Sequence, residues 1–290
     1  MMPKSITSSP LTSPLRYPGG KAFLCTYIER FLEINNFHPR LLIEPFVGGG
    51  SVALHLLGNQ KVDKIALYDK DPLVASFWDT AINDGLWLQN KVSKAKVTLK
   101  DWERLHKTNF TDVRANAWKC LFLNRTSFSG IMAPSAGPLG GKKQKSIYKI
   151  DCRFSRNSVL SRLKEIWNYR ERVEDVAVAD WDETIRKYNN NFNEDCLIYL
   201  DPPFFHKAEK LYRHYFDGEE HEKLVQKLSK LKVPWILSYD YCDEIVGILK
   251  KYRLGYRLID VRYSSNSKAP EKQKKEILAS NLNLPKRSSL

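Results

Sequence analysis

The chain has 290 residues, five cysteines and a formal net charge of +14. This length is enough for a full hydrophobic core, as one α/β domain with a large insert or as two lobes. No apolar run is long enough to cross a bilayer, and the N-terminal Met1–Pro10 lacks a secretory apolar segment. The cysteines are scattered without Cys-x-x-Cys spacing, and the histidines, His206 and His214 included, show no ligand spacing. Composition thus excludes a membrane span and predicts a cytoplasmic protein without a bound metal.

The positive charge is concentrated in one stretch. Residues 91–170 hold 18 Lys or Arg against 5 Asp or Glu, a net +13. A field of this kind is typical of a polyanion-binding surface, and the lysines of Gly140–Lys145 lie on a predicted loop. Solvated faces of helices such as Ser158–Tyr169 are the alternative, and a membrane surface is a weaker one. We favour contact with nucleic acid.

The first predicted unit is a helix over 22–36, then a short strand beginning at Leu41, three glycines and a second helix over Val52–Leu57. Glycines at a strand-to-helix turn let a ligand approach the backbone and the free N–H groups of the helix. No Gly-Lys-Ser/Thr follows, so a triphosphate loop is excluded. The spacing also lacks the full dinucleotide fingerprint, which favours a smaller, nucleoside-like cofactor.

The next strand, Lys64–Tyr68, ends in Asp69, and a helix is predicted from Pro72. Asp69 lies about 20 residues past the glycines, the spacing at which an acidic residue binds ribose hydroxyls in such folds. An Asp that only caps the following helix is the alternative.

Residues 85–170 break the alternation of strands and helices. This stretch contains helices and the Gly- and Pro-rich segment Asn124–Gly141, which predicts a loop or hairpin. Alternation then resumes, with seven strands in all, and Ser267–Lys275 is expected to form a hairpin loop. The last two strands have no helix between them and are therefore expected to be antiparallel. The later predicted strands are Asp175–Ala179, Cys196–Leu200, Pro234–Tyr239, Tyr256–Tyr263 and Glu276–Ser280, with helices over His221–Leu231 and Asp243–Lys251.

The segment Asp201-Pro202-Pro203-Phe204 follows the apolar run Cys196–Leu200. The prolines end the strand, so the carboxylate is left at its C-terminal end, where open α/β sheets bind ligands. Asp201 and the Pro202 carbonyl can each accept one N–H of an exocyclic amino group, and Phe204 can stack on the ring that carries it. The alternative for this tetrapeptide is a purely structural one, a strand followed by a proline turn with a solvated Asp.

Four landmarks in order, together with Lys275–Asn281, resemble the Dam-type (group alpha) DNA adenine-N6 methyltransferases over nearly the whole chain. These landmarks are Arg16–Lys21, Glu44–Ser51, Tyr68-Asp69 and Asp201–Phe204. The resemblance implies an α/β fold, a doubly wound class I methyltransferase (Rossmann-like) sheet of seven strands with a helical target-recognition insert. It implies a catalytic domain formed by residues 1–84 and 171–290 and a DNA-binding insert over 85–170.

The resemblance also implies the site. S-adenosylmethionine is the expected cofactor, and Asp201, Pro202, Pro203 and Phe204 are expected to hold an adenine flipped out of double-stranded DNA. The family usually has Tyr where this chain has Phe204, which keeps the stacking face and loses a hydroxyl. The residues expected to bind the cofactor are Tyr17, Lys21, Glu44, Phe46, Gly48, Gly50, Asp69 and Asp201.

Recognition of the target departs from the family. Relatives that read GATC carry an Arg that contacts guanine, and this chain has Ala133 at the matching place, so the target is expected to differ from GATC. Arg125 or residues from Lys142 to Arg156 are candidates to read a base instead. Phe128 is a candidate to wedge beside the extruded base, and a buried core Phe is the alternative. Lys142, Lys143 and Lys145 are expected to contact phosphates.

Three other functions stay open at this point. They are a cytosine-N4 methyltransferase, a nicotinamide-dependent oxidoreductase and an inactive DNA-binding protein that keeps the fold. The first group more often has Ser than Asp at the start of the motif, and the second leaves the basic insert unexplained. A role in a restriction-modification or phage DNA-marking system, with a cognate restriction endonuclease as partner, and a monomeric state are further expectations.

Overall fold

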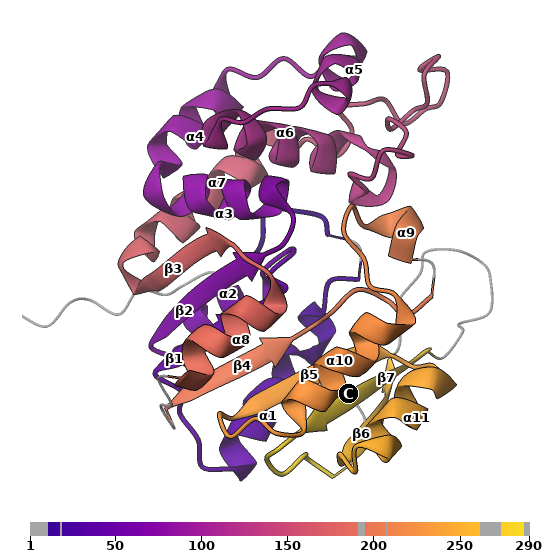
Figure 1. Ribbon diagram of the computed structural model, residues 1–290. Helices are drawn as coiled ribbons and strands as arrows, with labels where there is room; N and C mark the ends of the chain where they lie inside the picture. Colours follow the sequence, from indigo (N-terminus) through magenta and orange to yellow (C-terminus); the bar gives the residue numbers. More distant parts are fainter. Residues whose placement is uncertain (1–10, 18, 191–194, 207, 262–273, 287–290) are drawn as a thin grey trace, which may run out of the picture.

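The computed structural model describes residues 11–17, 19–190, 195–206, 208–261 and 274–286. Within them the chain forms a 7-stranded sheet of order β3-β2-β1-β4-β5-β7-β6 (Figure 1). β7 is antiparallel to β5 and β6, and the other neighbours are parallel. The strands are β1 (Leu41–Glu44), β2 (Lys64–Asp69), β3 (Val173–Val178), β4 (Cys196–Leu200), β5 (Trp235–Asp240), β6 (Tyr256–Val261) and β7 (Lys274–Ser280). The predicted fold class, with its antiparallel final pair, is confirmed.

Helices cover both faces of the sheet. α8, α10 and α11 pack on one face, and α1 and α2 lie on the other (Figure 1). None of the described helices is long and apolar enough to cross a membrane. The bounds are η1 (Ala22–Leu24), α1 (Cys25–Ile34), α2 (Ser51–Gly58), α3 (Pro72–Asn83), α4 (Gly85–Ser93), α5 (Leu99–Lys107), α6 (Val113–Thr126), η2 (Phe128–Gly130), α7 (Arg156–Asn168), η3 (Arg170–Arg172), α8 (Trp181–Asn190), α9 (Ala208–Leu211), α10 (Gly218–Leu228) and α11 (Asp243–Lys251).

Three helices differ from the prediction, among them the short α9, which was not predicted. α10 begins earlier than expected, because the Asp217 carboxylate accepts the Glu220 N–H at 2.8 Å and caps the helix there. α8 was not predicted at all. Its buried residues Trp181, Thr184 and Ile185 have the spacing of one helical face, which was the available signal.

The insert lies between α3 and β3 and consists of α4, α5, α6, η2 and α7. It does not have a core of its own: Trp102 and Phe122 of the insert belong to the same apolar cluster as Ile28 of α1 and Leu56 of α2. The predicted division into a catalytic domain and an insert therefore describes the chain order, while the hydrophobic core is continuous across it.

The Gly- and Pro-rich segment after α6 forms a closed loop, as the prediction of a loop or hairpin allowed. Ser127 and Pro138 form an isolated antiparallel bridge, and the Phe128 N–H donates to the Gly137 carbonyl at 2.9 Å. The start of the segment is helical, since α6 runs through Thr126. The other predicted loop, Ser267–Lys275, falls largely outside the described residues.

The topology creates a place for ligands between β1 and β4. These strands are neighbours in the middle of the sheet, and the chain leaves them toward opposite sides, which opens a crevice at their carboxyl ends. Glu44 ends β1, and Asp201 directly follows β4. The glycine turn after β1 and the segment after β4, both singled out in the sequence, therefore meet at the carboxyl ends of two central strands.

Candidate active site

A pocket lies at these strand ends and encloses about 810 Å³ of space, its open mouth included. Three parts of the chain line it: the segment before η1, the glycine turn after β1, and the segment after β4. All eight residues predicted to bind a cofactor are among the lining residues, which are Tyr17, Gly19, Gly20, Lys21, Glu44, Pro45, Phe46, Val47, Gly48, Gly49, Gly50, Ser51, Val52, Asp69, Lys70, Trp181, Tyr199, Asp201, Pro203, Tyr212, His214, Tyr215 and Phe216.

The glycine turn is shaped by two aromatic rings. Gly48 and Gly50 have positive φ angles of 44° and 61°. A Cβ at Gly48 would lie 2.8 Å from the Tyr17 ring, and one at Gly50 would lie 2.7 Å from the Trp78 ring. The Trp78 indole N–H also donates to the Gly48 carbonyl at 2.9 Å. Glycine is therefore required here by the protein's own packing.

Asp69, at the end of β2, holds the turn from the other side. Its Oδ2 accepts the Gly48 N–H at 2.9 Å, and its Oδ1 accepts the Asp71 N–H at 2.9 Å. Burial, reinforced by the neighbouring Asp71, raises the pKa of the Asp69 carboxyl to about 7. Asp69 lines the pocket, and its carboxyl therefore changes between the protonated and the ionised form near neutral pH.

Glu44 is buried beneath the turn, with 2% of its surface exposed. Its Oε1 accepts the Ala53 N–H of the first turn of α2 at 2.8 Å, which satisfies one of the free donors of that helix end. Burial raises the pKa of the Glu44 carboxyl well above its ordinary value.

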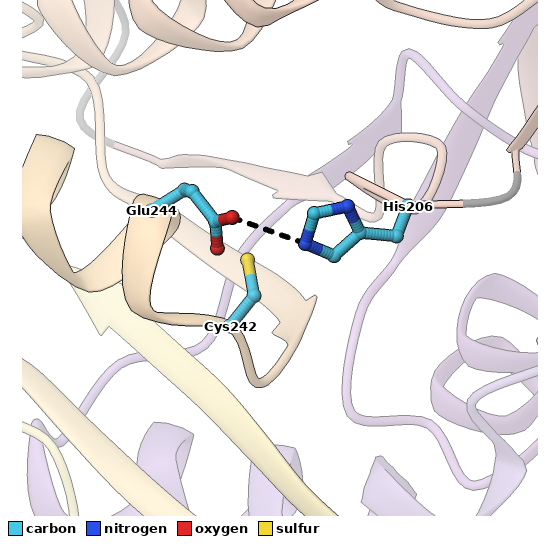
Figure 2. Close-up of side chains that lie close together, drawn as sticks. All are labelled: His206, Cys242 and Glu244. Atoms are coloured by element: carbon cyan, nitrogen blue, oxygen red, sulfur yellow. Dashed lines mark ion pairs between the residues drawn. The ribbon is translucent and has the colours of Figure 1, made fainter.

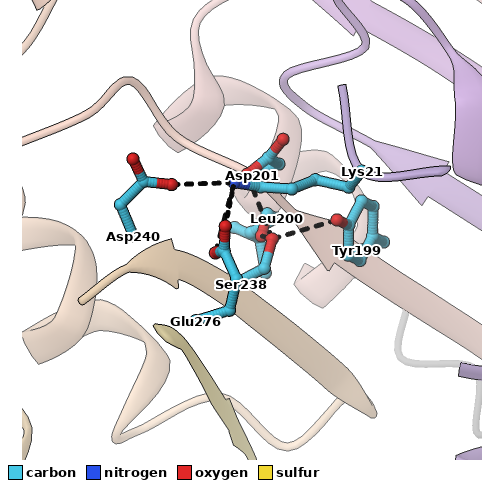
Figure 3. A network of polar contacts seen from close by, with 7 residues as sticks. All are labelled: Lys21, Tyr199, Leu200, Asp201, Ser238, Asp240 and Glu276. Atoms are coloured by element: carbon cyan, nitrogen blue, oxygen red, sulfur yellow. Dashed lines mark hydrogen bonds and ion pairs between the residues drawn. The ribbon is translucent and has the colours of Figure 1, made fainter. Parts of the chain in front are cut away.

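Lys21 is the centre of a cluster of charges (Figure 3). Its Nζ lies 3.4 Å from Asp201 Oδ1, 3.3 Å from Asp240 Oδ1 and 3.3 Å from Glu276 Oε2. The Lys21 side chain is only 3% exposed, and that of Glu276 only 2%. Burial by itself lowers the pKa of the ammonium, but the three carboxylates outweigh it and raise the pKa.

Asp201 is held on one of its oxygens. Besides Lys21, its Oδ1 accepts the Ser238 hydroxyl at 3.1 Å, and the same hydroxyl lies 2.9 Å from the Tyr199 hydroxyl (Figure 3). Burial raises the pKa of the Asp201 carboxyl to about 6, although Lys21 and Ser238 oppose the shift. The carboxyl is therefore mostly ionised at neutral pH.

An aromatic wall stands beside Asp201. The Phe204 ring lies 5.4 Å from the Lys21 Nζ and meets the Tyr212 ring edge-on at 5.7 Å. Tyr212 in turn stacks on Tyr17 at 6.0 Å. A Cβ at Gly19, whose φ is 77°, would lie 2.9 Å from both the Phe204 ring and the Tyr212 hydroxyl, so only glycine allows the backbone to pack this closely on the two rings.

The sequence did not single out Asp240, Glu276, Ser238 or Tyr212. A signal existed for two of them, because Asp240 follows a predicted strand and Glu276 begins another. Antiparallel pairing in the register Asp240↔Glu276 places both at the carboxyl end of β5. The pairing partner of β5 was not deducible from the pattern of apolar residues.

The predicted DNA-contacting residues lie apart from one another. Phe128 is 68% exposed, and Lys142, Lys143 and Lys145 are exposed farther along the same loop. Arg125 is 6% exposed on α6, and burial, with the charges of Arg162 and Arg16, lowers its pKa to about 10. To read a base, the Arg125 guanidinium would have to leave this position, so its role stays a prediction.

The order of the seven strands, the antiparallel β7 and the acidic residues at the ends of β1, β2 and β4 define the class I methyltransferase fold. The family model of the D12 class N6 adenine-specific DNA methyltransferases matches residues 17–265, and the chain belongs to this family. It is similar to the "Type II methyltransferase M.MjaIII" of Methanocaldococcus jannaschii, with 22% identity over 260 residues that cover 81% of this chain and 86% of that protein. The predicted adenine-specific DNA methyltransferase activity is thus confirmed over the cytosine-N4 and oxidoreductase alternatives.

The Lys21 cluster predicts a pH-dependent effect on stability. Lys21→Met leaves the buried Glu276 and the partly exposed Asp201 and Asp240 without the ammonium that they share. The loss should cost about 3–5 kcal/mol of unfolding free energy near neutral pH. Asp201, with an ordinary pKa of 3.8 and a folded pKa of about 6, binds more protons when folded, so its contribution to stability falls as pH rises between these values. The variant raises that folded pKa further, so its deficit should be larger at about pH 8 than at about pH 5.

Urea unfolding at both pH values measures this deficit. Lys61→Met is a matched control, because Lys61 pairs with Glu33 at 3.1 Å on the surface and its loss should cost less than about 1 kcal/mol. An equal deficit of Lys21→Met at the two pH values would contradict the assignment of the shared charge.

Proposed function

We propose that this chain transfers a methyl group from S-adenosylmethionine to the N6 amino group of an adenine extruded from duplex DNA. The observation that carries the proposal is that Asp201 lines the glycine-turn pocket, while the Phe204 ring packs against Gly19, which also lines it. The proposed acceptor for an amino group therefore lies next to the space proposed for a nucleoside-like donor. Membership of the D12 family supports adenine as the substrate base and methyl transfer as the reaction.

The pocket residues fit this donor. Backbone without side chains at Gly48 and Gly50 allows close approach, and Asp69 offers a carboxylate to ribose hydroxyls. The donor is a cation, and three carboxyl groups surround the single ammonium of Lys21, which favours a sulfonium nearby. Burial raises the pKa of the Glu276 carboxyl to about 8, so its share of this negative charge is reduced near neutral pH. When bound, S-adenosylmethionine supplies an electrophilic methyl group.

Asp201 and the Pro202 carbonyl would orient the nucleophile. The lone pair of an adenine amino group is delocalised into the ring, so the nitrogen is a poor nucleophile. Acceptors for both of its hydrogens allow it to become pyramidal and to aim its lone pair at the methyl carbon, which is catalysis by positioning and preorganised charge. After transfer the nitrogen carries an extra proton, which leaves to Asp201 or to water.

Lys21 has a positioning role in this scheme. It contacts the Asp201 Oδ1 and lies over the Phe204 ring, so it fixes both the acceptor and the stacking face. It also opposes the upward pKa shift that burial imposes on Asp201. The acceptor is thereby kept ionised at the pH at which the enzyme works.

The insert would bind the DNA. The exposed Phe128 ring is available to fill the space that an extruded base leaves, and the lysines of the loop are available to phosphates. Ala133 is buried and has no group that could read guanine, which supports a target other than GATC. The named Type II relative supports a restriction-modification role with a cognate endonuclease.

The assignment of Asp201 is tested by methyl transfer and DNA binding measured together. Asp201→Ala should lower the rate at least about 10²–10³-fold, because a preorganised acceptor is lost. Binding to duplex DNA should hardly change, since the insert is untouched. Asp63→Ala, which removes an exposed carboxylate, is the control. Near-normal turnover of Asp201→Ala would rule out its proposed role.

Stacking is tested at the same site. Phe204→Ala should lose most activity, whereas Phe204→Tyr should keep it because the aromatic face remains. Comparable losses in the two variants would show that Phe204 does not act by stacking.

The cofactor contact is tested at Asp69. Asp69→Ala should weaken binding of S-adenosylmethionine by about 1–3 kcal/mol, the cost of leaving hydroxyls without their acceptor. Since hydroxyl donors favour the ionised carboxylate and its pKa is about 7, wild-type affinity should rise as pH rises through this value and then level off. Asp69→Asn, which does not titrate, should lack this step. Calorimetry across this pH range that finds the step in both proteins would move the ribose contact elsewhere.

The DNA surface is tested by charge removal. Replacing Lys142, Lys143 and Lys145 by Ala should weaken binding to all duplexes alike and flatten the salt dependence by about one unit per lost contact. The matched control removes the same charge at three exposed lysines elsewhere: Lys223 on α10, Lys230 just after α10 and Lys250 on α11. Equal salt slopes in the two triple variants would show that the loop does not contact phosphates. Sequencing of methylated random DNA gives the target, and a sharp GATC motif would overturn the inference from Ala133.

A further inference from the structure

Three potential metal ligands come together next to the catalytic segment (Figure 2). They are the imidazole of His206, the thiol of Cys242 and the carboxylate of Glu244. One ligand atom from each lies within 4.8 Å of the others, and the His206 Nε2 is 3.2 Å from the Glu244 Oε1. Figure 2 shows the three side chains pointing toward one another, His206 from one loop and Cys242 and Glu244 from the start of a helix.

The fold brings these residues together from distant parts of the sequence. His206 follows Phe204 and Phe205 in the segment after β4, whereas Cys242 lies just past the end of β5 and Glu244 lies in the first turn of α11. β4 and β5 are parallel neighbours, so their carboxyl ends are adjacent. The spacing of histidines and cysteines along the chain therefore gave no hint of the group.

The donor set is chemically selective. Nitrogen, sulfur and oxygen together suit zinc and similar divalent transition cations, whereas magnesium and calcium prefer oxygen alone. Bonds of about 2.0–2.3 Å to such a cation place neighbouring donor atoms roughly 3.3–3.8 Å apart. The His206–Glu244 pair, at 3.2 Å, is just below this separation, and the thiol lies within 4.8 Å of both, so small side-chain movements would bring the three donors to it.

Exposure and local backbone favour entry of a cation. The side chains of His206 and Glu244 are 61% and 47% exposed, so both are free to adjust. Cys242 is half-buried at the N-cap of α11, and burial raises the pKa of its thiol. A cation would displace the thiol proton and form the thiolate at this helix end.

We propose that His206, Cys242 and Glu244 bind one zinc-class divalent cation, with a water molecule completing the coordination. The cation joins the segment after β4 to the segment after β5. His206 is two residues from Phe204, and Cys242 is two residues from Asp240, which contacts Lys21. The cation therefore links the segment that carries the proposed catalytic motif to the segment that carries part of the Lys21 cluster. It contacts neither the motif nor the cluster itself.

Cobalt(II) titration of the full chain, first freed of metal by a chelator, tests the site. One equivalent should give the near-ultraviolet thiolate charge-transfer band and the strong visible bands of a tetrahedral site, and zinc should displace it. Cys242→Ser should lose the thiolate band. His206→Ala and Glu244→Gln should weaken binding by at least about tenfold.

Matched controls separate this site from others on the surface. Cys152→Ser removes an exposed thiol, and His38→Ala removes a histidine that also pairs with a carboxylate, Asp63, so both should bind cobalt as the wild type does. Metal-free variants with the wild-type melting temperature confirm that folding is intact, and Glu244→Gln is the mildest of them. Absence of a thiolate band at one equivalent, or a band that survives Cys242→Ser, would overturn the proposal.

Discussion

The active site depends on the burial of one ammonium group among carboxylates from three strands. Lys21 reaches the sheet edge from the segment before η1 and contacts Asp201 after β4, Asp240 at the end of β5 and Glu276 in β7. Removing any buried partner leaves uncompensated charge, so the contacts hold the N-terminal segment and three strand ends in one arrangement. The same contacts keep the Asp201 carboxyl mostly ionised although it is buried. The buried Lys21 ammonium thus both holds these strand ends together and keeps the Asp201 carboxyl ionised.

Close packing of aromatic rings on glycines couples the two halves of the site. Tyr17 covers Gly48, while Phe204 and Tyr212 cover Gly19, at distances that leave no room for a Cβ. The glycine turn after β1, Tyr17 and Gly19, and the segment that carries Phe204 are therefore packed directly on one another. This arrangement suits a transfer reaction, in which donor and acceptor must be held in line.

The insert is tied to the same segment. The Asn124 Oδ1 accepts the Arg16 N–H at 2.6 Å, and its Nδ2 donates to the carbonyls of Arg16 and Gly130. A Cβ at Gly130 would lie 2.0 Å from the Arg16 carbonyl oxygen. The loop that carries Phe128 is thus fixed one residue away from Tyr17 of the pocket, which connects the proposed DNA surface with the proposed cofactor site.

The sequence by itself determined the α/β class, the seven strands, the antiparallel final pair and the motif residues that line the pocket. These features depend on local patterns: apolar runs, prolines after a strand and glycines at a turn. Asp240, Glu276 and Tyr212, the burial of Arg125, and the group of His206, Cys242 and Glu244 were decided only by the tertiary structure. The physical reason is that strand order and antiparallel register bring together side chains far apart in the chain, and a pattern of single residues does not encode which strand ends become neighbours.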